Sequence, residues 1–142
     1  MQISAKCSIA VHCLIFINEY SCLTKVTGEM ISSSTKTNSV TIRNILSALK
    51  KDGIISVKAG SGGSEIICPL EEITLYRICT AVEPDFADKL IGMHPSPSLN
   101  CPVGSKIHNV LETSYSKIRQ DLESSMKKIT LKDIINDYKS YS

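Results

Sequence analysis

Residues 26–67 decide the fold, and they read VTGEMISSSTKTNSVTIRNILSALKKDGIISVKAGSGGSEII. Two short helical patterns are followed by two short β patterns around a glycine-rich turn. The order helix, helix, strand, turn, strand is typical of a winged helix-turn-helix, which places its second helix in a DNA groove. The sequence therefore predicts a mostly α (α+β) fold with a two-stranded wing and a DNA-binding surface.

The second helix of this unit is predicted to begin at Asn38 or Ser39 and to end near Lys51. Its apolar residues recur at the spacing of one buried helix face: Ile42, Ile45, Leu46 and Leu49. The remaining polar side chains can contact base edges and phosphates, and Arg43 is the candidate for a base contact. The predicted DNA-binding residues of the two helices are Thr27, Ser39, Thr41, Arg43 and Asn44.

Residues 54–57 and 64–67 are predicted to form the two strands of the wing. The turn between them is rich in glycine, which lets a hairpin tip approach a phosphate backbone closely. A nucleotide-binding loop is excluded because no Lys-Ser/Thr pair follows the glycines and no helix opens after them. The predicted DNA-binding residues of the wing are Lys58, Gly60, Ser61, Gly62 and Gly63.

The flanking segments complete a predicted DNA-binding domain over residues 1–83. A first helix is expected at 4–20, with Ser4 able to cap its start, and a fourth at 71–82, ended by Glu83-Pro84. Residues 84–100 are predicted to be an irregular linker, because proline and serine punctuate them.

Residues 101–142 are predicted to form a dimerisation helix and a short C-terminal helix. Apolar residues recur at a helical period from about Pro102 to Ile129, a length of ~40 Å that a small head cannot cover. The simplest partner is the same helix of a second copy, and the predicted dimerisation residues are Ile107, Leu111, Ile118 and Leu122. Thr130 is expected to cap the last helix, which could fold back on the neighbour. The alternative is one larger monomeric helical domain.

Charge is distributed unevenly along the 142 residues, although the net charge is only +2. Residues 1–70 carry seven Lys/Arg against four Asp/Glu, so the positive excess lies on the half that contains the predicted DNA-binding unit. No apolar run reaches the ~18 residues of a membrane span, and six scattered cysteines suit a reducing compartment. A cytoplasmic protein without membrane contact is expected.

The order and spacing of several segments resemble the winged-helix repressors of the Rrf2 family, the IscR/NsrR group. The segments are residues 27–31, 40–53, 60–63, 72–75 and 81–83. Residues 101–108, which read CPVGSKIH, are similar to a YwnA-like branch of that family. The resemblance implies a bacterial homodimer that binds palindromic promoter DNA, with crossed long helices and a sensory linker.

The sequence departs from the family where cluster-bearing members hold iron. Those members carry three cysteines at roughly six-residue intervals in the linker. Here Cys101 has Pro95 and Lys89 at the corresponding positions, and neither can ligate iron. We therefore expect a regulator without an iron–sulfur cluster, other metal or cofactor. Cys101 is a possible redox sensor, because a helix N-terminus would favour its thiolate, although a purely structural role is an equal alternative.

Two other classes of function were weighed against a sequence-specific repressor. A winged-helix protein-interaction module that no longer binds DNA is the main alternative, and the positive charge of the first half disfavours it. An enzyme is not expected, since the sequence offers no nucleophile–base pairing, no HExxH, no paired-cysteine metal motif and no nucleotide loop.

Overall fold

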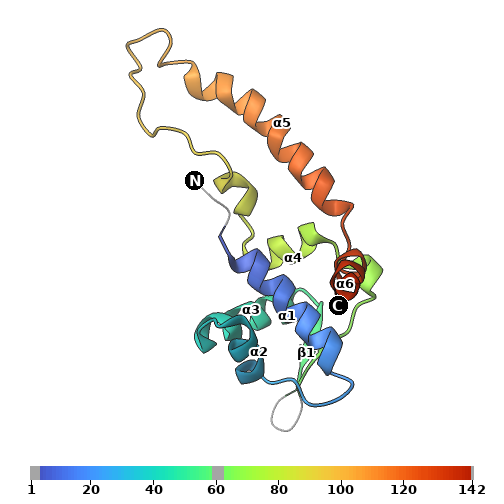
Figure 1. The fold of residues 1–142 in the computed structure, drawn as a ribbon. Coiled ribbons are helices and arrows are strands. Elements are labelled where there is room, and N and C mark those ends of the chain that lie inside the picture. Colours follow the sequence, from blue (N-terminus) through green and yellow to red (C-terminus); the bar gives the residue numbers. More distant parts are fainter. Residues whose placement is uncertain (1–3, 59–62, 142) are drawn as a thin grey trace.

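A computed structural model describes residues 4–58 and 63–141, and it confirms the winged helix-turn-helix (Figure 1). Its central unit is two helices and a two-stranded wing, preceded by one helix and followed by another. The elements are α1 (Lys6–Tyr20), α2 (Gly28–Thr35), α3 (Ser39–Lys51), β1 (Ile55–Val57), β2 (Ser64–Ile66), the 3-10 turn η1 (Leu70–Glu72), α4 (Leu75–Val82), the 3-10 turn η2 (Phe86–Lys89), α5 (Ile107–Lys127) and α6 (Leu131–Ser140).

Side-chain caps set the ends of the two central helices. The Thr27 hydroxyl accepts a hydrogen bond from the Met30 N–H at 3.2 Å, which starts α2. The Asn38 side chain accepts from two backbone N–H groups and starts α3. Gly53, at φ 81°, then turns the chain into β1. Ala5 rather than Ser4 is the N-cap residue of α1, but the Ser4 hydroxyl still accepts from the Lys6 N–H, the first of the helix, at 3.3 Å and donates to the Glu83 carboxylate at 2.7 Å.

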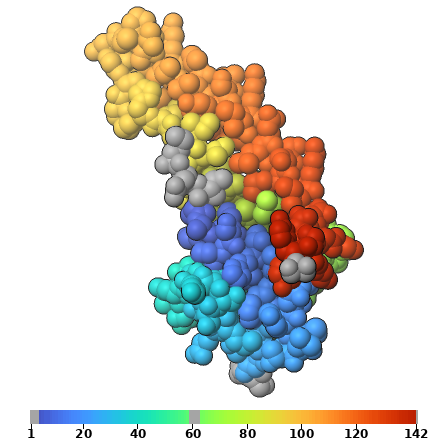
Figure 2. Space-filling model, viewed as in Figure 1, coloured from blue at the N-terminus to red at the C-terminus, as the bar shows by residue number. Residues whose placement is uncertain are grey.

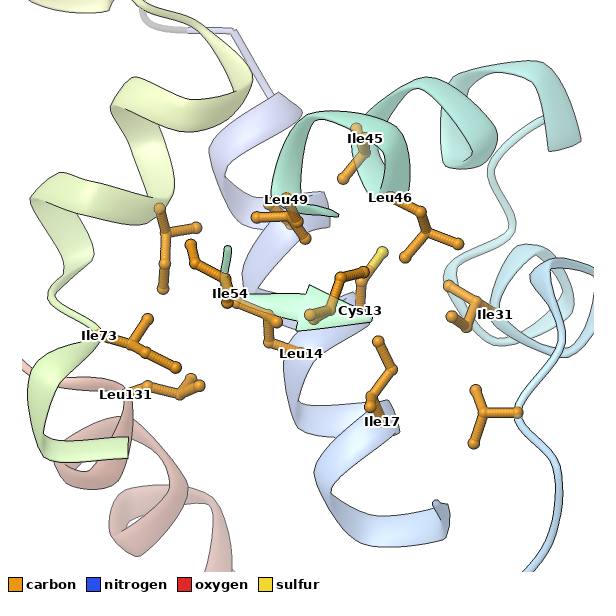
Figure 3. Packing of buried hydrophobic residues seen from close by; sticks show 14 of the residues in the cluster. Cys13, Leu14, Ile17, Ile31, Ile45, Leu46, Leu49, Ile54, Ile73 and Leu131 are labelled. Atoms are coloured by element: carbon orange, nitrogen blue, oxygen red, sulfur yellow. The ribbon is translucent and has the colours of Figure 1, made fainter. Parts of the chain in front are cut away.

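The wing is a two-stranded antiparallel sheet, in which Ile55 pairs with Ile66 and Val57 pairs with Ser64. The apolar sides of the helices and of β1 meet in one core (Figure 3). Its labelled members come from α1, α2, α3, the residue just before β1 and later segments of the chain, and they are Cys13, Leu14, Ile17, Ile31, Ile45, Leu46, Leu49, Ile54, Ile73 and Leu131.

Helix α6 packs against the winged helix-turn-helix of its own chain, although the sequence also allowed it to fold back on a neighbour. Thr74 and Thr130 form an isolated β-bridge, and the Leu131 N–H donates to the Ile73 carbonyl at 2.7 Å. Leu131 and Ile135 are buried in the main core, and Figure 2 shows α6 in red against the blue of α1. We therefore call residues 4–83 together with α6 the head.

Residues 84–127 form an arm that extends away from the head (Figure 1). The linker was predicted to be irregular, but part of it forms the 3-10 turn η2, in which Phe86 is buried. The long helix begins at Ile107 rather than Pro102, so it is ~30 Å long. Residues 101–106 form turns instead, and a side chain at Gly104 would collide with the Ser98 carbonyl. Within the described ranges, no helix is long and apolar enough to cross a membrane.

Candidate nucleic-acid interface

A concave surface of about 700 Å³ lies between the start of α2, the outer side of α3 and the end of β1. We call it the reading surface. It is lined by Thr27, Gly28, Glu29, Ser39, Arg43, Leu46, Ser47, Lys50 and Val57. Three of the predicted DNA-binding residues thus lie together there, on two helices whose relative position is fixed by the core.

The chemistry of the reading surface suits a nucleic acid. Arg43 and Lys50 are exposed and can neutralise phosphates, while the guanidinium can also donate to guanine. Glu29 adds an acceptor that can pair with a cytosine amino group. A Cβ at Gly28 would meet nothing within 4 Å, so the first turn of α2 is open to a close approach. The surface therefore combines phosphate-binding and base-reading groups.

The other two predicted residues of α3 lie elsewhere. Thr41 and Asn44 line a smaller hollow of about 120 Å³ together with Lys6 of α1 and Val82 of α4. The structure therefore divides the polar residues of α3 between two sides. Sequence analysis missed Ser47 and Lys50, although both continue the helical spacing of Ser39 and Arg43.

The wing is described only in part, because Gly60, Ser61 and Gly62 lie outside the described residues. Lys58 is exposed at the end of β1, and its N–H donates to the Gly63 carbonyl at 3.3 Å. A Cβ at Gly63 would lie 2.6 Å from the Val26 nitrogen. Position 63 therefore has room only for glycine, because the segment that leads into α2 passes close to it.

Polar contacts outside the core fix the elements that carry the reading surface. Arg77 of α4 donates to the Asp52 carboxylate at 2.8 Å and to the Asp52 carbonyl at 2.9 Å, at the end of α3. It also contacts the Cys68 sulfur after β2 at 3.2 Å. The pair with Asp52 raises the pKa of Arg77. His12 of α1 hydrogen-bonds the Ser34 hydroxyl of α2 at 2.8 Å. These contacts hold α2, α3 and the wing against α1 and α4.

Cys101 lies on the arm, exposed and away from the reading surface. The pKa of its thiol is lowered, first by the backbone N–H of Gly104 and then by that of Val103. The sequence analysis placed Cys101 at a helix N-terminus, but α5 begins only at Ile107. The lowered pKa therefore comes from the local turn, and a sensor role for Cys101 stays a prediction.

The predicted dimerisation residues differ in their surroundings. Ile118 is 43% exposed, whereas Ile107 and Leu111 are half-buried. Leu122 packs against a second buried cluster of the same chain, which contains Cys7, Cys79, Phe86 and Met126. Val110, which was not among the predicted residues, is 59% exposed. The middle and first part of α5 thus present apolar side chains to solvent.

The fold and the reading surface define a class, the winged helix-turn-helix DNA-binding proteins. Residues 3–137 match the family described as "Rrf2: Iron-dependent Transcriptional regulator", and the chain belongs to this family. Its members are regulators of transcription rather than enzymes, in agreement with the sequence analysis.

Individual relatives agree with this membership. The chain is 31% identical over 135 residues to YwnA of Bacillus subtilis (strain 168), which is described as an HTH-type transcriptional regulator, and the match covers 95% of this chain and 98% of YwnA. A crystal structure described as that of a DNA-binding protein superposes with a TM-score of 0.74 at 29% identity, covering 92% of this chain and 98% of the other.

More distant structures share the fold. IscR of T. potens has a TM-score of 0.71 at 16% identity, covering 100% of this chain and 92% of its own. The oxidised form of Staphylococcus aureus CymR has a TM-score of 0.69 at 18% identity, covering 95% and 96%.

The residues present do not fit the iron centre that the family description implies. Among residues 4–58 and 63–141, no group of three or more His, Cys, Asp or Glu side chains is placed to hold a metal ion. An iron–sulfur cluster requires several thiolates, but Cys7, Cys13 and Cys79 are buried in the head, far from Cys101 on the arm.

Proposed function

We propose that the chain is a homodimeric repressor that binds a palindromic promoter site without an iron–sulfur cluster. The observation that carries this proposal is the reading surface, in which Ser39, Arg43 and Lys50 of α3 meet the open start of α2. A recognition helix of this kind enters the major groove, and its polar side chains contact bases and phosphates there.

Each group has a role in the proposal. Arg43, at the middle of the reading surface, reads a base edge, and Lys50 binds a phosphate next to it. Thr27 uses its oxygen to cap α2 but keeps its hydroxyl proton for a phosphate. Lys58 extends the phosphate contacts to the flanking backbone. This arrangement supports one bound half-site per head.

The arm supports the homodimer. Val110 and Ile118 are 59% and 43% exposed on a helix that projects beyond the head. Packing this helix against the same helix of a second copy would bury both stripes around a two-fold axis. Two heads related by that axis match a palindrome, because each head faces an equivalent half-site.

The distribution of cysteines supports a regulator without a cluster. Within the described part of the chain, Cys101 does not belong to any group of three or more His, Cys, Asp or Glu side chains placed to hold a metal ion. The signal that the arm receives is therefore a different one.

The test is to isolate the genomic fragments that purified protein retains and to measure its affinity for them at several salt concentrations. We expect tight, salt-dependent binding to inverted repeats, with a visible spectrum free of iron–sulfur absorption after anaerobic purification. Binding that shows no preference among fragments would contradict the repressor assignment, and cluster absorption would contradict the second part of the proposal. A protein-interaction module would retain no DNA at all.

A further inference from the structure

A second cavity, of about 480 Å³, lies where α1, α4, α5 and α6 meet. Neither the reading surface nor the exposed stripe of the arm explains it. Its walls are almost entirely apolar, and they contain three sulfur atoms. The lining residues are Cys7, Ser8, Val11, Leu75, Cys79, Phe86, Leu122, Met126 and Ile134. We call this space the sulfur cavity.

The three sulfur-bearing residues come from three different helices. Cys7 lies in α1, Cys79 in α4 and Met126 near the end of α5, and their exposed fractions are 9%, 2% and 8%. All three belong to one buried cluster. Soft sulfur donors from separate elements, gathered in an apolar space, are the ligand type that soft cations select.

We propose that the sulfur cavity binds one soft monovalent d¹⁰ cation, Cu(I) or Ag(I), through the thiolates of Cys7 and Cys79 and the thioether of Met126. Each cysteine that ligates the cation releases its thiol proton to solvent, so no oxidant or reductant is consumed. The site would carry a net charge of −1, from two thiolates and one monovalent cation.

Harder divalent ions fit this site less well. Zn²⁺ in a closed protein site takes four nitrogen, sulfur or oxygen ligands, and the cavity lining supplies no histidine or carboxylate. The nearby Glu83 carboxylate is engaged, since it accepts the Ser4 hydroxyl at 2.7 Å and the Lys89 ammonium at 3.4 Å. Two thiolates and a thioether suit the low coordination number of a monovalent coinage metal.

The site joins the arm to the head. Ligation would tie Met126 of α5 to Cys7 and Cys79 of the head, and so fix the angle at which α5 leaves it. Because α5 sets the spacing of the two heads in the proposed dimer, cation binding is expected to change operator affinity. That consequence rests on the proposed function, whereas the metal site does not.

The test uses the full chain, reduced and anaerobic, titrated with Ag(I) and separately with Cu(I) against a chromogenic Cu(I) chelator. We expect one cation per chain that is not removed by excess glutathione. Loss of an outer-shell partner alone costs 10–100-fold in metal affinity, so Cys7→Ala and Cys79→Ala should each lower affinity by ~100-fold or more. Met126→Leu, which conserves volume, should lower it about tenfold.

Cys22→Ala is the matched control, because Cys22 is exposed and lies outside the cavity. It should leave affinity unchanged. Circular dichroism verifies that each variant is folded, and Met126→Leu keeps the test decisive if a cysteine variant unfolds. If Met126→Leu and the parent protein bind the cation with equal affinity, Met126 is not a ligand. Binding that is lost with Cys22 or Cys101 instead, or that glutathione abolishes, overturns the proposal.

Discussion

The head and the arm differ in how far they bury their apolar side chains. In the head, Leu14, Ile17 and Leu49 are fully buried by contacts within one chain. In the arm, Met126 is the one buried residue of the 21 in α5, and it lies where the helix meets the head. The head thus has a complete core, whereas the first part of α5 leaves apolar side chains exposed.

The largest effect is expected from a charge placed on the exposed apolar side of α5. Ile118→Glu should separate the chains, because an unpaired carboxylate would be buried at the proposed dimer interface. Two linked heads gain roughly 10²–10⁴-fold in avidity, so operator affinity should fall by about that factor. Sedimentation equilibrium and DNA titration measure the two effects.

Gln120→Glu is the control, since it adds the same charge on the opposite side of α5. It should leave both the mass of the protein and its affinity for DNA nearly unchanged. A dimeric Ile118→Glu variant would show that the arm does not join the chains.

A cavity introduced by mutation into the core of the head tests how tightly the head is packed. Leu49→Ala removes a fully buried side chain of α3 and should lower the free energy of unfolding by about 2–5 kcal/mol. Leu99→Ala on the arm, where the side chain is 83% exposed, should change it by less than ~0.5 kcal/mol. Urea unfolding of both variants gives the difference, and equal losses would mean that the arm is as well packed as the head.

Within the head, the two sides of α3 are expected to differ. Arg43→Ala should weaken operator binding by ~1–3 kcal/mol and relax the preference at one base pair of each half-site. Asn44→Ala changes a residue of the hollow between α3, α1 and α4, and it should weaken operator binding less than Arg43→Ala does. Competition titrations with operator variants measure both, and a larger loss for Asn44→Ala would reverse the assignment of the reading surface.

The junction of arm and head depends on the capping box of α6. The Thr130 hydroxyl accepts from the Asp133 N–H at 3.1 Å, and the Asp133 carboxylate accepts from the Thr130 N–H at 3.0 Å. Thr130→Ala should lower the free energy of unfolding by about 1 kcal/mol, measured by urea unfolding with Ser140→Ala as the control. An unchanged stability would mean that α6 is held by its apolar side chains alone.

The same box gives a pH dependence with a defined sign. Hydrogen bonds from Thr130 hold the pKa of Asp133 below its ordinary value. The stabilisation is therefore present above the unfolded pKa and is lost as the pH falls through the lower folded value. The difference in free energy of unfolding between the parent protein and Asp133→Asn, which removes the titrating carboxylate, should shrink on acidification, as urea unfolding at several pH values measures.

The smallest expected effect is at the wing. Lys58→Ala should weaken binding to all sequences alike and reduce the salt slope by about one per subunit. Lys139→Ala in α6 is the control for loss of a charge, because α6 packs against η1 and contributes no residue to the reading surface. A change in base preference with Lys58→Ala would assign the wing a reading role.

Local patterns predicted the head well because its elements carry their own signals. The caps at Thr27 and Asn38, the buried stripe of α3 and the turn at Gly53 are all short-range features. Helical spacing already separates Thr41 from Arg43, since two residues turn the helix by about 200°. Which polar side is covered by α1 and α4, and which opens beside the start of α2, was not predictable because it depends on tertiary packing.

The arm was predicted less well for a related reason. The helix was expected to begin near Pro102, but the close packing of Gly104 against Ser98 replaces its first turns. The packing of α6 on the head of its own chain depends on the β-bridge between Thr74 and Thr130, which are distant in sequence. Neither contact has a local sequence signal.

The central claim is that two heads, joined by their arms, bind one two-fold symmetric site. The most direct measurement is the mass of the complex on the chain's own operator, together with its affinity for a duplex in which one half-site is scrambled. We expect two chains per palindrome and an affinity loss of roughly 10²-fold or more on the scrambled duplex. One chain per palindrome, or equal affinity for both duplexes, would contradict the account.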